Sequence, residues 1–342
     1  MRSILMKRFF HHSQFLFLLL PVFLFLNAVD EDAIAKKKAA EDFRTNFVAT
    51  QISTPEQLGW TGSEKKCKPG KVAHDTYVKM LARINYFRRL AGVSDQIVLD
   101  SSWNKYAQAA ALIMFANQTL NHNPGASMKC FSEDGKTGAS TSNLSLFSGI
   151  AIQDMIADEI EDGSNSENKD CGHRRWLLRS NAYKMGFGAT PESYAVRDFA
   201  TNDELKNDTS SFHGIVPEYF AYPFKGFVPY QVVFCKWSFA IPAGADYKLA
   251  TVEVKAGDKT LNCSVVSRGT ANYGDPTFIW FINGLKQDFD YHYYDMSEKR
   301  TAFVNLGLLN KKVTVKISNV KVEGKVKSYS YSFTIIDPDE WK

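Results

Sequence analysis

The chain has 342 residues, of which 44% are hydrophobic, 13% aromatic and 23% charged. This is ordinary globular composition, and the length is enough for two hydrophobic cores. The formal net charge is only +4 and is not gathered into a long basic block. The charge therefore argues against a nucleic-acid partner and against polybasic docking to a membrane.

Residues 1–29 have the layout of a secretory signal peptide. Arg2, Lys7 and Arg8 form a basic start, an apolar run extends from Phe15 to Leu26, and small or polar residues follow it. The run has roughly a dozen apolar residues, whereas a helix that spans a bilayer needs about 20. No later segment is a transmembrane candidate. We therefore expect a secreted, extracellular protein whose mature form has no transmembrane anchor.

Five cysteines would enter an oxidising compartment, so one of them must be left over. Cys130 and Cys171 both lie in polar loops beside histidines, which favours a disulfide between them. Cys235 and Cys263 lie in one β-rich region and form the second predicted pair. Cys67 is then unpaired.

Four Asn-X-Ser/Thr sequons are compatible with N-glycosylation of a secreted protein. The candidate residues are Asn117, Asn143, Asn207 and Asn262. A bacterial source would make them meaningless, and the sequence leaves the source open.

The first half of the chain reads as helices joined by polar segments. Residues 30–71 are charged and irregular and are interpreted as a leader segment, whose Ala-Lys-Glu part is compatible with a helix. Apolar residues recur at helical spacing from Tyr77 to Phe87, and Gly92 stands where such a helix would stop. Asp100 and Ser101 are N-cap candidates for a second helix. Residues 121–149 are rich in Asn, Ser, Gly and Lys, which predicts a long loop.

A further amphipathic helix is predicted over residues 152–160. The apolar residues that share one face are Ile152, Met155, Ile156 and Ile160. Glu159 lies within that face, and a buried carboxylate is costly unless it is paired, so Glu159 is a candidate site residue. The residues predicted to face solvent are Asp154, Asp158 and Glu161.

The hydrophobic period changes to two beyond a proline-marked linker at residues 213–230. Seven short strands are predicted at residues 232–239, 248–256, 260–267, 277–282, 301–306, 312–317 and 329–336. Residues 231–342 suit an all-β sandwich of immunoglobulin-like size. The Cys…Trp…Cys order of antibody domains is absent, so this prediction depends on the alternation alone.

Few side chains in the first domain could act as metal ligands or acid–base groups. These are His122, Asp158, Glu159 and His173. Two imidazoles with one or two carboxylates could hold Zn²⁺ or Mg²⁺. The sequence contains no HExxH, GxSxG, P-loop or GxGxxG motif, which argues against nucleophilic catalysis and phosphate binding by those routes.

The order of these features resembles the extracellular CAP family, which comprises cysteine-rich secretory, antigen 5 and pathogenesis-related 1 proteins. The resemblance is carried by Asn85-Tyr-Phe-Arg-Arg, Leu99 before a helix, Leu120-Asn-His122, Asn143-Leu, the acidic helix, Gly172-His173-Arg-Arg-Trp-Leu-Leu and Gly186-Phe-Gly188. It covers roughly residues 73–189. The segment from Val216 onward resembles the immunoglobulin-like extension of some secreted members.

The resemblance implies an α+β fold, with an α-β-α sandwich CAP domain at residues 72–212 followed by the β-sandwich. It also implies an open cleft whose two histidines and two acids can bind a divalent metal. His122 and His173 match the family histidines, and Glu159 matches the acid of the cleft helix, with Asp158 as the one-residue alternative. Ser142 occupies the place of the other acid, so one of the four groups is missing.

The leading functional hypothesis is a secreted CAP protein that binds a sterol, another lipid or a protein, rather than an enzyme. The alternative is a metal-dependent hydrolase of the same fold, with Glu159 as general base and two histidines holding zinc; Ser142 counts against it. A third hypothesis is an adhesive surface or secreted glycoprotein whose β domain binds a protein and whose cleft is vestigial. The sequence leaves the ligand and the oligomeric state open.

Overall fold

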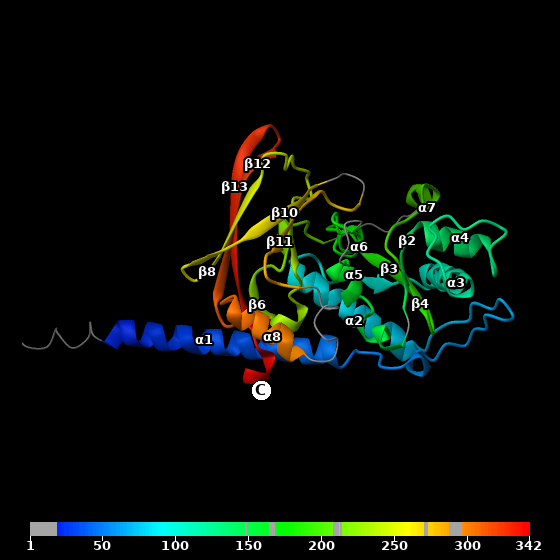
Figure 1. Ribbon diagram of the computed structural model, residues 1–342, viewed down its shortest axis with the longest axis horizontal. Helices are drawn as coiled ribbons and strands as arrows, with labels where there is room; N and C mark the ends of the chain where they lie inside the picture. The colour runs from blue at the N-terminus through cyan, green and yellow to red at the C-terminus, as the bar shows by residue number, and fades with distance from the viewer. Residues whose placement is uncertain are drawn as a thin grey trace, which may run out of the picture.

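The computed structural model describes residues 19–147, 149–163, 168–207, 212, 214–269, 273–286 and 296–342. A mainly helical part is followed by a β-rich part, and the two pack against each other (Figure 1). The architecture is therefore α+β. Most of the predicted signal peptide, residues 1–18, lies outside the described residues.

The predicted leader segment begins inside a long helix, which includes its Ala-Lys-Glu part. Helix α1 (Leu19–Phe43) continues into a π-helical turn, η1 (Arg44–Val48). It lies along the C-terminal part of the molecule (Figure 1), where Arg44 donates to the Pro338 carbonyl at 3.0 Å. Among the residues that the structure describes, no helix has the length and apolarity required to span a bilayer.

Helices α2 and α3 confirm the expected caps. Helix α2 (His74–Ala91) ends at Gly92, whose φ of 77° lies in the left-handed region that glycine tolerates. Helix α3 (Ser101–Asn117) begins after Asp100, whose carboxylate accepts from the backbone N–H groups of Ser102 and Trp103.

The predicted loop over residues 121–149 contains a further helix, α4 (Glu133–Ser140). Glycine lowers helix propensity, which hid this helix from the sequence. The glycines instead serve packing, because a Cβ at Gly138 would lie 2.1 Å from the Tyr106 carbonyl oxygen of α3.

A four-stranded sheet forms the middle layer of the helical part. The strands are β1 (Val98–Leu99), β2 (Ser142–Leu146), β3 (Lys184–Thr190) and β4 (Ser193–Arg197), in the order β1-β3-β4-β2. Helices α3 and α4 cover one face, while α2, α5 and α6 lie on the other (Figure 1). This is the expected α-β-α layering.

The helix predicted over residues 152–160 is broken. A 3₁₀ segment, η3 (Gly149–Asp154), is followed by a short helix, α5 (Ala157–Glu161), because Ile156 between them has a φ of 73°. The break changes the helical phase, so Glu161 is buried, whereas we expected it in solvent. Glu159 is buried as predicted, and Asp158 is partly buried.

The C-terminal part consists of two facing sheets. The first contains β5 (Phe220–Tyr222), β7 (Lys236–Ala240), β10 (Cys263–Arg268) and β11 (Thr277–Ile282), in the order β10-β11-β7-β5. The second contains β6 (Gly226–Pro229), β8 (Thr251–Ala256), β9 (Lys259–Leu261), β12 (Lys312–Val322) and β13 (Lys325–Ile336), in the order β6-β13-β12-β8-β9. Trp237 of the first sheet packs edge-on against Phe333 of the second, with ring centroids 5.2 Å apart.

Three predictions for this part differ from the structure. The strand predicted at 260–267 is two strands that belong to different sheets, β9 and β10. The segment at 213–230 is more than a linker, because it contains β5, which pairs with β7, and β6, which pairs with β13. The strand predicted at 301–306 belongs to helix α8 (Met296–Asn305). Six alternating residues were too few to outweigh the helix-forming run that precedes them.

The predicted disulfide pairing is also wrong. Cys130 pairs with Cys67, at a Cα–Cα distance of 4.8 Å, and Cys171 is a buried free thiol. Cys235 and Cys263 flank Ile282 on opposite sides, since β11 lies between their two strands. Two strand spacings amount to about 9.6 Å, which exceeds the reach of a disulfide.

Candidate functional site

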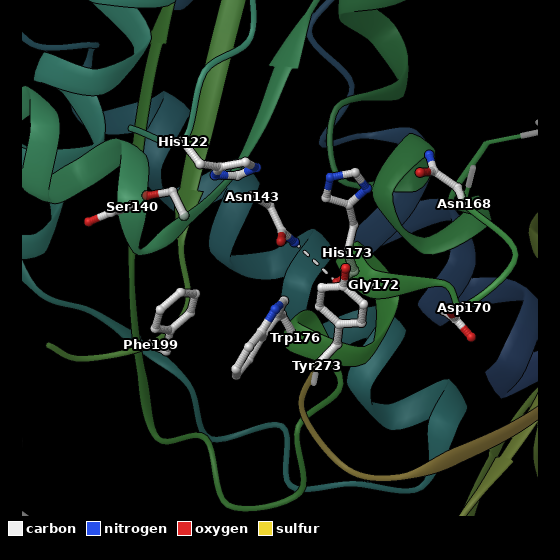
Figure 2. Close-up of a pocket in the computed structure, with 11 residues that line it drawn as sticks. His122, Ser140, Asn143, Asn168, Asp170, Gly172, His173, Trp176, Phe199 and Tyr273 are labelled. Carbon is white, nitrogen blue, oxygen red and sulfur yellow. Dashed lines mark hydrogen bonds between the residues drawn. The ribbon is translucent and has the colours of Figure 1, made fainter. Parts of the chain in front are cut away.

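A cavity of about 420 Å³ lies where the helical part meets the C-terminal part. Figure 2 shows the residues that line it. They are His122, Ser140, Ser142, Asn143, Asn168, Asp170, Gly172, His173, Trp176, Phe199 and Tyr273. Among the described residues, Tyr273 is the contribution from the C-terminal part, and the two histidines predicted from the sequence both face this space.

His122 follows α3 and is held by α4. Its Nδ1 lies 2.8 Å from the Ala139 carbonyl oxygen, which can only accept, so Nδ1 carries the proton and donates. The Nε2 atom is left to interact with a ligand. The structure thus explains how a residue in an irregular segment has a defined ring orientation.

His173 is the second residue of helix α6 (Gly172–Leu177). Its Nδ1 lies 2.9 Å from Oδ1 of Asp162, a carboxylate with no solvent exposure. Burial lowers the pKa of the imidazole, but the hydrogen bond and charge of Asp162, with the charge of Glu159, raise this pKa to about 9. His173 therefore carries a positive charge at neutral pH, and its Nε2 is the ring nitrogen left for a ligand.

Glu159 lies behind the cavity wall rather than in it. Nδ2 of Asn143 donates to Oε2 of Glu159 at 2.7 Å and to the His173 carbonyl at 3.1 Å. Burial raises the pKa of Glu159 to about 7. Glu159 thus orients Asn143 and adds negative charge near His173, without being a lining residue.

Comparison with known families covers the same part of the chain. Residues 81–199 match the model of the cysteine-rich secretory protein family, CAP. The match covers about a third of the chain, so this region is similar to a CAP domain, and the helical part that contains it is called the CAP domain below. No curated protein matches the chain. The matched residues include both cavity histidines, Asn143 and Glu159, whereas the β-rich part after residue 199 lies outside the match.

The CAP domain does not bring together the metal ligands that the resemblance implied. Across the described ranges, no three His, Cys, Asp or Glu side chains gather closely enough to hold a metal ion. Glu159 is engaged by Asn143, and Ser142, whose buried Oγ has no hydrogen-bond partner in the structure, stands where a second acid would be. The side chains present do not fit a resident Zn²⁺ or Mg²⁺ held by the protein alone.

Two buried acids of the CAP domain escaped the sequence analysis. Asp162 orients His173, but in the sequence it precedes a glycine and reads as a turn residue. Asp198 follows β4 and is fully buried; burial, and then the charge of Glu159, raise its pKa well above the ordinary value. In the sequence, Asp198 follows Arg197, a pattern typical of a charge pair on the surface. No spacing pattern in the sequence marks either acid.

The glycosylation candidates have different surroundings. Asn143 is 2% exposed and its amide is fully engaged, so a glycan there is incompatible with the fold. Asn117 also uses its amide, donating to the carbonyls of Ile113 and Lys129. Asn262 is exposed. The side chain of Asn207, the last residue of α7 (Asn202–Asn207), lies outside the described residues.

Proposed function

We propose that this is a secreted CAP-domain protein that acts by binding a small organic ligand in the cavity. One observation carries the proposal: His122 and His173 each use Nδ1 to bind the protein, which leaves both Nε2 atoms available at the same cavity. Fixed polar groups that converge on a concave space are typical of ligand sites. The cavity volume lies in the range of such sites, about 300–1,000 Å³.

The lining favours an amphipathic ligand. Two imidazoles, one of them cationic, suit an anionic or hydrogen-bond-accepting head group. The rings of Trp176 and Phe199 stack with centroids 4.5 Å apart, and Figure 2 shows them beside Tyr273 at the other end of the site. These rings suit an apolar ring system. Of the ligands that the family resemblance implies, we therefore propose a sterol or other lipid with a polar head.

The other two hypotheses have less support. A metal-dependent hydrolase would need Glu159 as general base, but Glu159 does not line the cavity. An adhesive role would assign the function to the C-terminal part, which we propose to be an immunoglobulin-like sandwich on the basis of its two facing sheets. That role does not explain the fixed histidines of the cavity.

The test is fluorescence titration of the full mature chain with anilinonaphthalene sulfonate, which joins an anionic group to aromatic rings. We expect saturable binding that cholesterol sulfate displaces. His122→Gln and His173→Gln should each weaken it about tenfold, the effect of losing one charge-assisted hydrogen bond. His74→Gln, at an exposed position on α2, is the matched control and should have no effect.

Pretreatment with a chelator separates this proposal from a metal-dependent one. The titration should be unchanged after pretreatment. Equal affinity in all three histidine variants, or binding that requires an added metal, would contradict the proposal.

A further inference from the structure

The described residues between α5 and α6, 162–163 and 168–171, shape the cavity and are called the cavity segment. Asp162 orients His173, and Asn168 and Asp170 line the cavity. Asp162 itself has a φ of 60°, an uncommon conformation for a residue other than glycine. A residue in this conformation persists only where surrounding contacts hold it.

Lys236, the first residue of β7, supplies those contacts. Its side chain is buried, at 1% exposure. Its Nζ donates to the carbonyl of Asp162 at 2.6 Å and to the carbonyl of Asn168 at 3.1 Å. Burial of an ammonium group is costly unless its N–H donors are hydrogen-bonded. Lys236 therefore depends on these two carbonyls, and they are held at fixed positions relative to its Nζ. One side chain of the β-rich part thus binds two points of the cavity segment.

Helix α6 strengthens this connection. The Arg174 backbone N–H donates to Oδ2 of Asp162 at 3.2 Å, so the same carboxylate holds both His173 and the start of the helix. The Arg174 guanidinium donates to the Lys236 carbonyl at 3.0 Å and lies over the Tyr222 ring. The cavity segment, α6 and β7 therefore form one hydrogen-bonded unit.

Strand β10 and the connection between β10 and β11 also contact residues at the cavity. The Ser267 hydroxyl of β10 donates to the carboxylate of Asp170. Nε of Arg175 donates to the Asp275 carbonyl at 3.2 Å, and Tyr273 forms part of the cavity wall. The C-terminal part therefore contributes one wall and several supports.

We propose that the β-rich part is a component of the ligand site rather than a separate module, and that Lys236 is the positioning residue that connects them. The proposal deepens the proposed function and depends on it for the ligand, but the connection itself does not require one. Lys236 acts through the Asp162 and Asn168 carbonyls and does not touch the cavity.

The test compares Lys236→Met with Lys299→Met in the full mature chain. Lys299 is also 1% exposed and donates to a carbonyl, that of Gln231, but it lies on α8, away from the cavity. Proton NMR should show a low-field resonance from the His173 N–H that Asp162 binds. We expect this signal in the wild type and in Lys299→Met, and its loss in Lys236→Met. Hydrogen exchange of residues 168–174 should accelerate only in Lys236→Met.

Ser267→Ala is a milder second variant that retains Lys236. It should accelerate exchange near Asp170 without changing the melting temperature by more than a degree or two. Persistence of the His173 signal in a folded Lys236→Met, or equal changes in both lysine variants, would overturn the proposal. If Lys236→Met does not fold, unchanged exchange in Ser267→Ala would overturn it. These measurements need no ligand. Failure of the wild type to bind the sulfonate probe would therefore contradict the proposed function but not the role of Lys236.

Discussion

The CAP domain and the β-rich part bury different kinds of side chain. The interior between the two sheets is largely aromatic and aliphatic, with ring contacts such as Trp237 on Phe333 and Phe239 on Tyr329. The CAP domain instead buries many charged groups. In the described residues these include Arg83, Arg88, Glu159, Glu161, Asp162, Arg174, Arg175, Arg197 and Asp198. Those of the β-rich part are Lys236, Lys299 and Asp337.

Residues other than glycine with positive φ occur in both parts, and those of the described β-rich part are Asn310, Asn319 and Glu323. The CAP domain places such residues beside its site. Ile156, Asp162 and Cys171 all have positive φ, and all three lie next to the elements that carry Glu159 and His173. A β-branched residue such as Ile156 adopts this conformation at a cost. The CAP domain thus holds polar groups and strained residues in place at its site, and the hydrophobic core that it shares with the β-rich part supplies the apolar packing around them.

Trp237→Ala should have the largest effect, because it removes the centre of that packing. Trp237 is fully buried, and deletion of a buried aromatic side chain costs about 3–5 kcal/mol. Urea unfolding monitored by circular dichroism would measure it. Val326→Ala, at a side chain that is 70% exposed, is the control and should change stability by less than about 0.5 kcal/mol. A small effect of Trp237→Ala would show that the aromatic packing between the two sheets contributes little to stability, contrary to the comparison.

Removal of the Cys67–Cys130 disulfide should come next. The two cysteines are 63 residues apart, and closure of a loop of that size stabilises the fold by about 4 kcal/mol on the chain-entropy model, less where the unfolded chain retains structure. Cys67→Ser/Cys130→Ser should lower the melting temperature of the oxidised protein. Dithiothreitol should then have little further effect. A double variant as stable as the wild type would show that the CAP domain does not need this constraint.

Glu159→Gln should have the smallest effect and an unusual sign. The pKa of Glu159 is raised from 4.5 to about 7 by burial, so its contribution to stability is complete below pH 4.5 and is lost as the pH rises through 7. The amide removes this loss, so the variant should be more stable than the wild type at pH 8, by on the order of 2 kcal/mol. The difference should shrink towards pH 4.5.

Denaturant unfolding at several pH values would measure this change. Glu41→Gln, at an exposed residue of α1, should show no such trend. A Glu159→Gln variant that is less stable at pH 8 would mean that the buried charge is stabilising, contrary to the comparison.

The sequence by itself determined the elements that depend on local periodicity and local caps. Helix α2 with its stop at Gly92, helix α3 with its Asp100 cap, and the alternating strands β8, β12 and β13 are all readable from neighbouring residues. The motifs also predicted that His122 and His173 belong to one site, and in the structure both line one cavity.

Only the tertiary structure decided what those residues contact. The break at Ile156 changed the phase of the acidic segment, and Asp162 became the partner of His173. Cys67 pairs with Cys130, and Lys236 binds a segment more than 60 residues earlier. Periodicity reports which side chains are buried, because burial depends on one face of one element. It does not report the partner, because a hydrogen bond or disulfide depends on the relative position of two elements that are far apart in the chain.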